Sequence, residues 1–271
     1  MKVDLAEKIA VVTGGAAGIG EAAAQALVEC GAAVTIFDRD ADAGIRTASA
    51  IVSGSASCEF VKCSVEDGQQ VQSAVEAVVS KHGRIDILVN NAGIQLYGDL
   101  VSTSEEDWDR LMDINLRGAF LVSKHVLPHM LRRGGAIVNV GSVQSFTAVS
   151  NSIAYVTAKH AILGLTRAMS LDYAQRGIRV NCVCPGAIDT PMLRSAASLS
   201  PDPEAVLRNC DRMHAMGRIG QPEEVANAIA YLASPLASFI TGAALVVDGG
   251  MLVPAGGMGF QEGGPAAATR K

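Results

Sequence analysis

The hydrophobic positions of this chain alternate between short β-branched runs and longer stretches in which apolar residues recur at helical spacing. The short runs predict seven strands, at Ile9–Thr13, Ala33–Phe37, Glu59–Lys62, Ile87–Asn90, Ala136–Val140, Ile178–Val183 and Ala244–Val247. Helical spacing predicts helices between them, at Gly18–Cys30, Asp40–Ser53, Asp67–His82, Glu105–Arg132, Tyr155–Gln175 and Glu223–Ala233. Strands that alternate with helices imply right-handed βαβ units. The pattern therefore predicts an α/β fold with a doubly wound, seven-stranded parallel sheet flanked by helices.

Three stretches depart from this rhythm. Glu105–Arg132 is long for one helix, and we expect two helices with a break near Asn115. Ser195–Ala215 contains Pro201 and Pro203 and predicts an insertion, so a substrate loop is expected at about residues 190–216. No internal repeat or linker divides the remainder, so residues 1–250 are expected to form one domain. The Gly-, Pro- and Ala-rich tail, residues 251–271, either is disordered or lies over a neighbouring surface.

Composition narrows the class of protein. The chain is 49% hydrophobic and 18% charged, which is enough apolar material for a sizeable core. A net charge of −5 gives no global basic field, so we expect no nucleic-acid partner. No charge-free run reaches the roughly 18 apolar residues of a membrane span. The start of the chain runs straight into a strand, so we expect no secretory signal and no membrane partner.

The six cysteines lack the C-x2-C spacing of zinc sites. Cys182-x-Cys184 lies in an apolar strand, which favours buried thiols over metal ligands. No histidine pairs with a carboxylate at ligand spacing, so we predict no metal. His214 lies in the insertion and could approach a substrate. Unpaired thiols favour a reducing, cytoplasmic location.

A glycine-rich turn, Thr13-Gly14-Gly15-Ala16-Ala17-Gly18-Ile19-Gly20, follows the first strand and opens the first helix. Its glycines allow a tight turn and a close approach to a pyrophosphate, and the helix N-terminus supplies free N–H groups. The spacing is G-x-x-x-G-x-G rather than the general G-x-G-x-x-G. A strand, turn and helix in this order predict a dinucleotide site.

Asp38 ends the second strand, eighteen residues after Gly20. A carboxylate there can accept hydrogen bonds from the adenosine ribose and would repel a 2′-phosphate, which favours NAD over NADP. The alternative is a helix N-cap, which Asp38 or Asp40 could provide. Arg39 is adjacent and could partly offset the repulsion.

Six features, in chain order, resemble the classical short-chain dehydrogenase/reductase family. They are the loop Thr13–Gly20, the turn Asn90-Asn91-Ala92-Gly93, Asn115, Ser142, the pair Tyr155-x-x-x-Lys159, and Pro185-Gly186. The match covers about residues 5–250. The resemblance implies a Rossmann-type sheet, a nicotinamide cofactor, and a homotetramer or homodimer.

The resemblance also assigns roles by position. It implies that Ser142 holds the substrate oxygen, Tyr155 is the acid/base, Lys159 contacts the nicotinamide ribose and Asn115 anchors a relay water. The cofactor contacts it implies are Gly14, Ala17, Gly18, Ile19, Gly20, Asp38, Ser64, Val65, Asn91, Ala92, Gly93, Tyr155, Lys159, Pro185, Gly186, Ile188 and Thr190. Many members carry an Asp near Ser64 that meets the adenine amine. Here a serine or a backbone group would substitute.

The chemistry of alcohol oxidation fits these residue types. A base must remove the hydroxyl proton as the hydride leaves, and an ordinary tyrosine titrates too high for that at neutral pH. Lys159 is four residues beyond Tyr155, so both share one helix face. We expect the Lys159 ammonium to lower the pKa of Tyr155. In isolation such a pair is an ordinary surface feature, and Ser142 an ordinary turn residue.

Substrate residues are expected at the carboxyl ends of the strands, at Gln95, Ser142, Gln144, Tyr155 and Met192. Polar Gln95 and Gln144 favour a small-molecule alcohol or carbonyl with further hydroxyls, such as a sugar or polyol, while cyclic secondary alcohols remain an alternative. Two other functions stay open. One is an NADPH-dependent 3-ketoacyl or other carbonyl reductase, and the other is a nucleotide-binding regulator without turnover.

Overall fold

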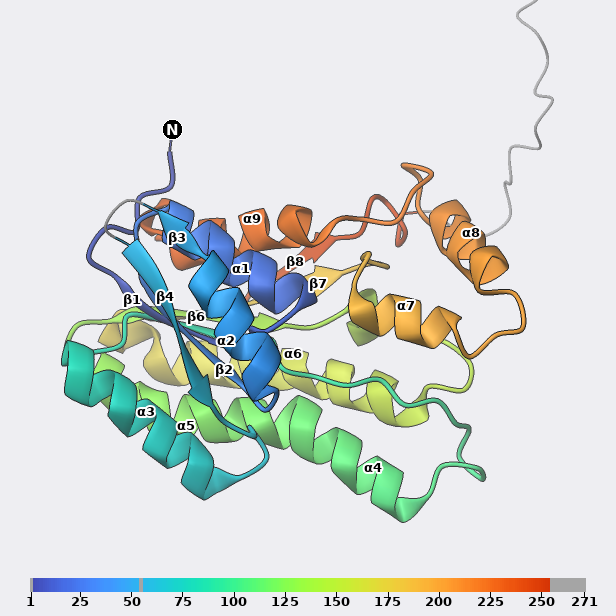
Figure 1. The fold of residues 1–271 in the computed structure, drawn as a ribbon, viewed down its shortest axis with the longest axis horizontal. Coiled ribbons are helices and arrows are strands. Elements are labelled where there is room, and N and C mark those ends of the chain that lie inside the picture. Colours follow the sequence, from blue (N-terminus) through green and yellow to red (C-terminus); the bar gives the residue numbers. More distant parts are fainter. Residues whose placement is uncertain (1, 54–55, 254–271) are drawn as a thin grey trace, which may run out of the picture.

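The computed structural model describes residues 2–53 and 56–253, which form a parallel sheet with helices on both faces (Figure 1). The strands are β1 (Ile9–Thr13), β2 (Ala33–Asp38), β3 (Val52–Ser53), β4 (Ala56–Lys62), β5 (Ile87–Asn90), β6 (Gly135–Val140), β7 (Ile178–Pro185) and β8 (Ala244–Val247). The helices are α1 (Gly18–Glu29), α2 (Ala41–Ala50), α3 (Gly68–His82), α4 (Glu105–Met112), α5 (Gly118–Met130), α6 (Ile153–Tyr173), α7 (Pro191–Ala197), α8 (Pro203–Met213) and α9 (Pro222–Ala233).

The strand order is β3-β4-β2-β1-β5-β6-β7-β8, and the seven strands from β4 to β8 pair in parallel. The predicted doubly wound, seven-stranded α/β sheet is confirmed. An eighth strand, β3, was not predicted. It pairs antiparallel with β4 at the sheet edge and has only two residues, too few to give a hydrophobic pattern.

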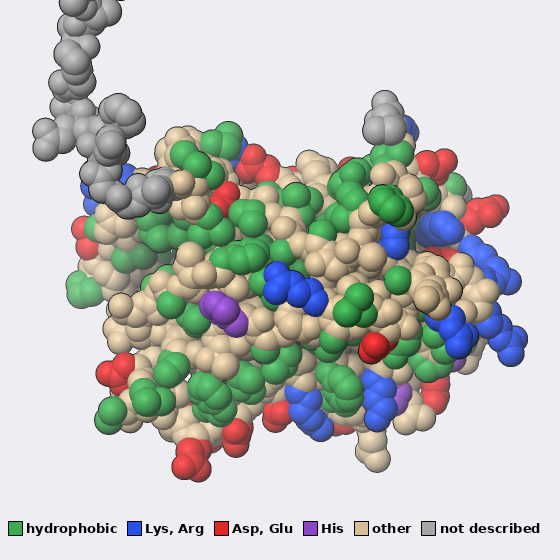
Figure 2. All heavy atoms as spheres, turned by 180° about the vertical axis from the view of Figure 1, so that it is seen from behind, with side chains coloured by type: hydrophobic (Ala, Val, Ile, Leu, Met, Phe, Trp, Pro, Cys, Tyr) green, Lys and Arg blue, Asp and Glu red, His purple; other side chains and the backbone are tan. Residues whose placement is uncertain are grey.

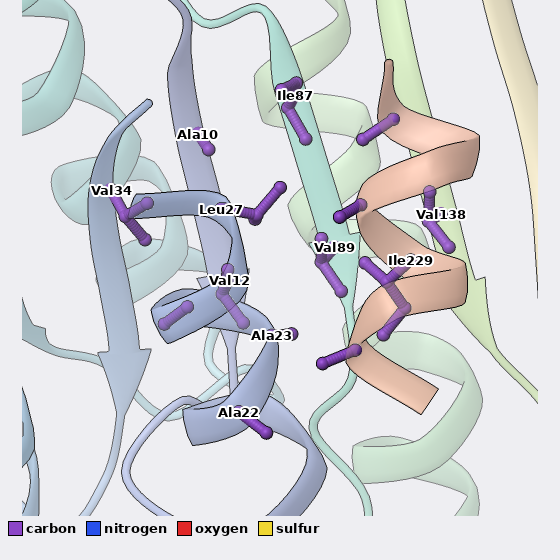
Figure 3. Packing of buried hydrophobic residues seen from close by; sticks show 14 of the residues in the cluster. Ala10, Val12, Ala22, Ala23, Leu27, Val34, Ile87, Val89, Val138 and Ile229 are labelled. Carbon is purple, nitrogen blue, oxygen red and sulfur yellow. The ribbon is translucent and has the colours of Figure 1, made fainter. Parts of the chain in front are cut away.

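Successive strand residues point to opposite faces of the sheet, and both faces are covered. On one face Val12, Val34 and Val89 pack under α1 and α9 (Figure 3). On the other face Val11 and Leu88 join a core that includes α3, α5 and α6. Burial on both sides explains why the strands appear in the sequence as continuous apolar runs.

Helix α1 meets the sheet and α9 through small side chains. Ala22, Ala23 and Leu27 of α1 lie against Ile229 of α9 in the same core cluster, and Figure 3 shows the two helices side by side over the strands. Alanines let the helix axes come close, so this pair closes one face of the sheet.

The expected break near Asn115 is confirmed. A five-residue π-helical turn, Asp113–Arg117, separates α4 from α5. Asn115 is 2% exposed, and its amide exchanges two hydrogen bonds with the backbone of Ile94, both 2.8 Å long. The wider turn gives Asn115 its inward position, in keeping with the frequent occurrence of π-bulges at functional sites.

The stretch expected to be an insertion forms α7 and α8. Proline stands at the first turn of both helices, where its missing N–H costs nothing, and Thr190 and Asp202 are the N-caps. Pro203 thus begins a helix rather than breaking one. The two alternatives for the tail stay open, because residues 254–271 lie outside the described residues.

All six cysteines are free thiols, and burial raises the pKa of both Cys58 and Cys63 to about 12. No helix within the described residues has the length and apolar character needed to cross a membrane. Over residues 2–53 and 56–253, no three His, Cys, Asp or Glu side chains come together as a metal site.

Candidate active site

The glycine-rich loop between β1 and α1 is enclosed by other segments. Gly14 and Gly18 have φ of +62° and +59°, in the left-handed region that favours glycine. A Cβ on Gly14 would lie 2.8 Å from the backbone of Ala92, and one on Gly18 would lie 3.2 Å from the Thr190 side chain. The loop is therefore a cradle that side chains would fill, bordered by the turn after β5 and the stretch after β7.

The peptide groups of this loop are held on both sides. Asp38 Oδ2 accepts a hydrogen bond from Ala16 N at 3.1 Å, and the buried Thr47 hydroxyl donates to Ala16 O at 3.0 Å. Asp40, not Asp38, is the N-cap of α2, because it accepts from Ala43 N at 3.0 Å. The N-cap alternative for Asp38 is therefore excluded, and its carboxylate faces the loop.

The turn after β5 is tied to the same loop. Asn91 Nδ2 donates to Thr13 O and Gly14 O at 3.0 and 2.9 Å. Thr13 Oγ1 accepts from the backbone N–H groups of Asn91 and Ala92. Thr13 and Thr47 are positioning residues that the sequence analysis did not identify, since their role depends on contacts distant in sequence.

A cleft of about 260 Å³ opens above this loop, at the carboxyl ends of the strands. Predicted residues that line it are Gly14, Ala17, Gly18, Ile19, Asp38, Ser64, Val65, Asn91, Ala92, Gly93, Thr190 and Met192. Lining residues that were not predicted are Phe37, Arg39, Cys63, Glu66, Ile94 and Pro191. All six directly adjoin predicted ones in the sequence. A cleft with a glycine cradle, a helix N-terminus and a carboxylate at one end fits a dinucleotide.

Six predicted cofactor residues are not among the lining residues of this cleft: Gly20, Tyr155, Lys159, Pro185, Gly186 and Ile188. Gly20 has a packing reason, because a Cβ there would lie 2.0 Å from Gly14 O. Ile188 lines a second cavity of about 240 Å³ behind the stretch that follows β7. The cofactor contacts of these residues remain predictions.

Tyr155 and Lys159 lie on the first two turns of α6, and Ser142 follows β6. Lys159 is 5% exposed, and its Nζ donates to Val140 O at 2.8 Å. That Nζ lies 5.4 Å from the centre of the Tyr155 ring. Ser142 Oγ accepts from Gln144 N at 3.1 Å and also hydrogen-bonds Tyr155. Three of the four predicted catalytic side chains, those of Ser142, Tyr155 and Lys159, therefore lie together.

The expectation that Lys159 lowers the pKa of Tyr155 is wrong for this arrangement. Burial raises the pKa of Tyr155 to about 12, against a smaller lowering by the Ser142 hydrogen bond. Burial also lowers the pKa of Lys159 to about 8, and its ammonium is directed to a carbonyl rather than to the phenol. Desolvation is the largest cause of both pKa shifts.

The predicted substrate residues differ in how far their side chains are exposed. Gln144 is half-buried, and its Oε1 is enclosed yet accepts no hydrogen bond from any part of the chain that the structure describes. Met192 is 40% exposed at the cleft. Gln95 is half-buried in the loop after Gly93. Burial raises the pKa of Tyr97, two residues further on, and the nearby Tyr155 raises it further.

Comparison with known proteins agrees with this geometry. The profile of the family described as Enoyl-(Acyl carrier protein) reductase matches residues 14–252. L-fucose dehydrogenase of Bos taurus is 37% identical over 243 residues, 89% of this chain and 88% of its own. Cyclohexanol dehydrogenase of an Acinetobacter species is 38% identical over 244 residues, 89% of this chain and 93% of its own.

Among solved structures, the ligand-free aldohexose dehydrogenase of Thermoplasma acidophilum superposes with a TM-score of 0.86. It is 41% identical, and the match covers 94% of this chain and 98% of that one. The sequence matches, the order of the strands in the sheet and the group formed by Ser142, Tyr155 and Lys159 all indicate the same family. The chain belongs to the classical short-chain dehydrogenase/reductase family and is an NAD(P)-dependent oxidoreductase that acts on CH–OH groups.

Proposed function

We propose that this protein is an NAD-dependent dehydrogenase that interconverts a secondary alcohol bearing a second, neighbouring hydroxyl with its carbonyl. The observation that carries this proposal is the enclosed Gln144 Oε1, which lacks a donor within the described residues. An unpaired buried acceptor is costly, and a substrate hydroxyl would supply the missing donor once a turn of the side chain exposes this oxygen. The backbone N–H of Gln144 donates to Ser142 Oγ, so this residue is held next to the proposed reacting centre.

In this proposal Tyr155 exchanges the proton with the substrate oxygen, and Ser142 hydrogen-bonds that oxygen. The nicotinamide ring would accept or return the hydride. Lys159 would contact the nicotinamide ribose. Asn115 would hold a relay water. Its Oδ1 and Nδ2 each already make one hydrogen bond to the backbone of Ile94. The water would therefore bind to the second lone pair of Oδ1 or to the second hydrogen of Nδ2.

The preference for NAD over NADP rests on Asp38. Its carboxylate lines the cleft beside the loop, and a 2′-phosphate there would meet a like charge. Arg39 also lines the cleft, so the repulsion is partly offset. The named activities of two relatives, on L-fucose and on aldohexose, agree with a hydroxyl-rich substrate, whereas that on cyclohexanol agrees with the cyclic-alcohol alternative.

The test compares substrates that differ by one hydroxyl. Initial rates of NAD reduction with cyclohexane-1,2-diol and with cyclohexanol keep the ring constant. We expect kcat/KM to favour the diol by about tenfold or more in the wild type, because the diol pairs Gln144 Oε1. Gln144→Leu keeps the size but removes the acceptor, and should bring the ratio close to one.

An unchanged ratio in Gln144→Leu would refute the role of this amide. Clear preference for NADPH over NADH, in parallel assays that measure the reduction of ketones, would instead support the carbonyl-reductase alternative. Binding of NAD without turnover of any substrate would favour the non-catalytic regulator.

We also propose that the protein assembles as a homodimer or homotetramer. Exposed apolar side chains occur on α5 and α6, where Phe120 is 49% and Leu171 81% exposed, and near β8, where Phe239 is fully exposed. Figure 2 shows hydrophobic side chains spread over one face, with a Lys or Arg side chain near its middle and most other charged side chains toward its edges. Mass measurement at micromolar concentration should give two or four chains, and a stable monomer would contradict this.

The free thiols agree with the proposed cytoplasmic location.

A further inference from the structure

His214 is a buried residue directly after α8, and it does not face the cleft. It is 4% exposed, and both ring nitrogens are engaged. Nδ1 lies 2.7 Å from Cys210 O, and Nε2 lies 3.1 Å from Ala187 N. A backbone N–H can only donate, and a carbonyl can only accept. Nε2 is therefore the acceptor and Nδ1 carries the hydrogen, so this arrangement requires a neutral imidazole.

The partner of His214 belongs to the stretch that follows β7. Ala187 comes directly after Gly186, and its carbonyl accepts from Gly220 N at 2.9 Å. Both polar groups of Ala187 are thus tied to the chain around α8. Gly186 leaves room for the ring, because a Cβ there would lie 2.7 Å from His214 Nε2. A side chain at position 186 would therefore collide with the His214 ring.

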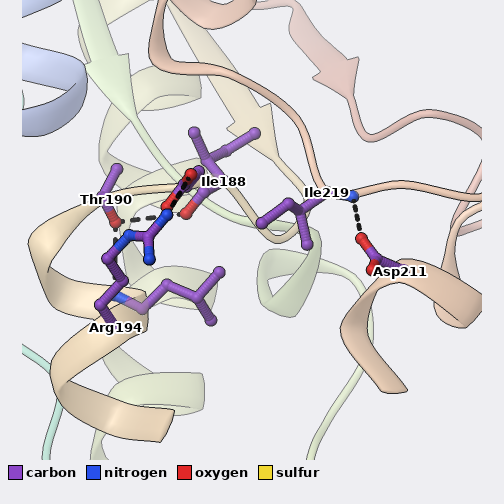
Figure 4. Close-up of polar contacts among 7 residues, drawn as sticks. Ile188, Thr190, Arg194, Asp211 and Ile219 are labelled. Atoms are coloured by element: carbon purple, nitrogen blue, oxygen red, sulfur yellow. Dashed lines mark hydrogen bonds and ion pairs between the residues drawn. The ribbon is translucent and has the colours of Figure 1, made fainter. Parts of the chain in front are cut away.

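Other bonds fix each of these segments internally, as Figure 4 shows for the end of α8, and one more bond joins them. Asp211 Oδ1 accepts from Ile219 N at 2.8 Å, which fixes the chain just beyond α8. Asp189 N donates to Gly220 O at 2.9 Å, and Asp189 forms an ion pair with Arg194 of α7 at 2.7 Å. Residues 187–190 are consequently held from one side by α7 and from the other by the end of α8.

We propose that His214 is a positioning residue that holds residues 187–190 in place for the nicotinamide half of the cofactor. This inference rests on the proposed function, in which that stretch lies beside the nicotinamide. The adenine half would bind at Gly14, Asp38 and Val65, in the cleft that His214 does not line. Loss of the bond to Ala187 N should therefore weaken the binding of one half of the cofactor and spare the other.

Two substitutions separate the two hydrogen bonds of the ring. His214→Gln keeps an acceptor near the Nε2 position but loses the bond to Cys210 O. His214→Asn keeps a donor near the Nδ1 position but loses the bond to Ala187 N. His160→Asn is the matched control, because His160 Nδ1 makes the same contact one turn back, to Val156 O at 2.9 Å, on an exposed helix face.

The measurement is the dissociation constant of NAD and of ADP-ribose, which lacks the nicotinamide, by titration calorimetry at pH 8. We expect His214→Asn to bind NAD about tenfold more weakly, the scale of one lost buried hydrogen bond, with ADP-ribose changed less than about twofold. His214→Gln and His160→Asn should resemble the wild type. Unchanged ADP-ribose binding also shows that each variant is folded.

Equal NAD affinity of the Asn and Gln variants would overturn the inference, as would equal weakening of NAD and ADP-ribose. A wild type that binds neither ligand would instead overturn the proposed function on which the inference rests.

Discussion

Replacing Tyr155 with phenylalanine is expected to lower kcat for alcohol oxidation by about 10²- to 10⁴-fold, the range that a positioned acid/base contributes. The ring and its packing remain, so the dissociation constant of NAD should change little. Stopped-flow or steady-state rates of NAD reduction measure the first effect, and calorimetry the second. Tyr173→Phe, at the far end of the same helix, is the matched control and should retain full activity. Turnover that survives in Tyr155→Phe would remove the proposed acid/base.

The raised pKa of Tyr155 gives the same prediction a pH dependence. Only the phenolate can take a proton, and at any pH below about 12 its fraction grows tenfold for each pH unit. We therefore expect kcat/KM for oxidation to rise from pH 7 to pH 9, and the reverse reduction, which uses the protonated tyrosine, to be favoured near neutral pH. An oxidation rate that is highest at pH 7 would contradict this assignment.

The second large effect concerns the choice of cofactor. Asp38→Asn removes the charge but keeps an oxygen that can accept from Ala16 N, so the loop should stay in place. Because a like-charge contact costs several kcal/mol, we expect the ratio of kcat/KM for NADP to that for NAD to rise about 100-fold. Asp40→Asn removes an equal charge two residues away, at the N-cap of α2, and should leave the ratio unchanged.

An unaltered ratio in Asp38→Asn would show that the carboxylate does not govern selectivity. Equal changes in both variants would show that the general negative charge near the cleft, rather than the position of Asp38, decides between the cofactors.

Much of the fold could be predicted because local pattern and tertiary role coincide. Strands such as β1 and β5 are buried on both faces and so appear as apolar runs. The break near Asn115 was predicted because Glu105–Arg132 is long for a single helix. An asparagine inside a helix is disfavoured by propensity, and in the structure its side chain bonds the backbone of Ile94. The glycine-rich loop was predictable since only glycine suits the backbone of Gly14 and Gly18.

What could not be predicted depends on contacts between distant segments. The direction of the Lys159 ammonium, toward Val140 O, follows from the placement of α6 over β6, and spacing along one helix does not contain it. The tie between His214 and Ala187 N joins residues 27 positions apart. Likewise, Thr47 reaches the glycine-rich loop from α2. In each case a polar side chain bonds a backbone group that is distant in the sequence, and only the folded structure shows which group it is.

The pairing of α1 with α9 has a consequence for synthesis of the protein. Roughly 190 residues separate the end of α1 from the start of α9, although the two helices lie side by side over the sheet. At ribosomal rates of about 5–20 residues per second, α1 emerges about 10–40 s before its partner exists. During that interval the apolar face formed by Ala23 and Leu27 has no permanent cover. The nascent chain thus presents a hydrophobic surface to chaperones until nearly its last helix has been made.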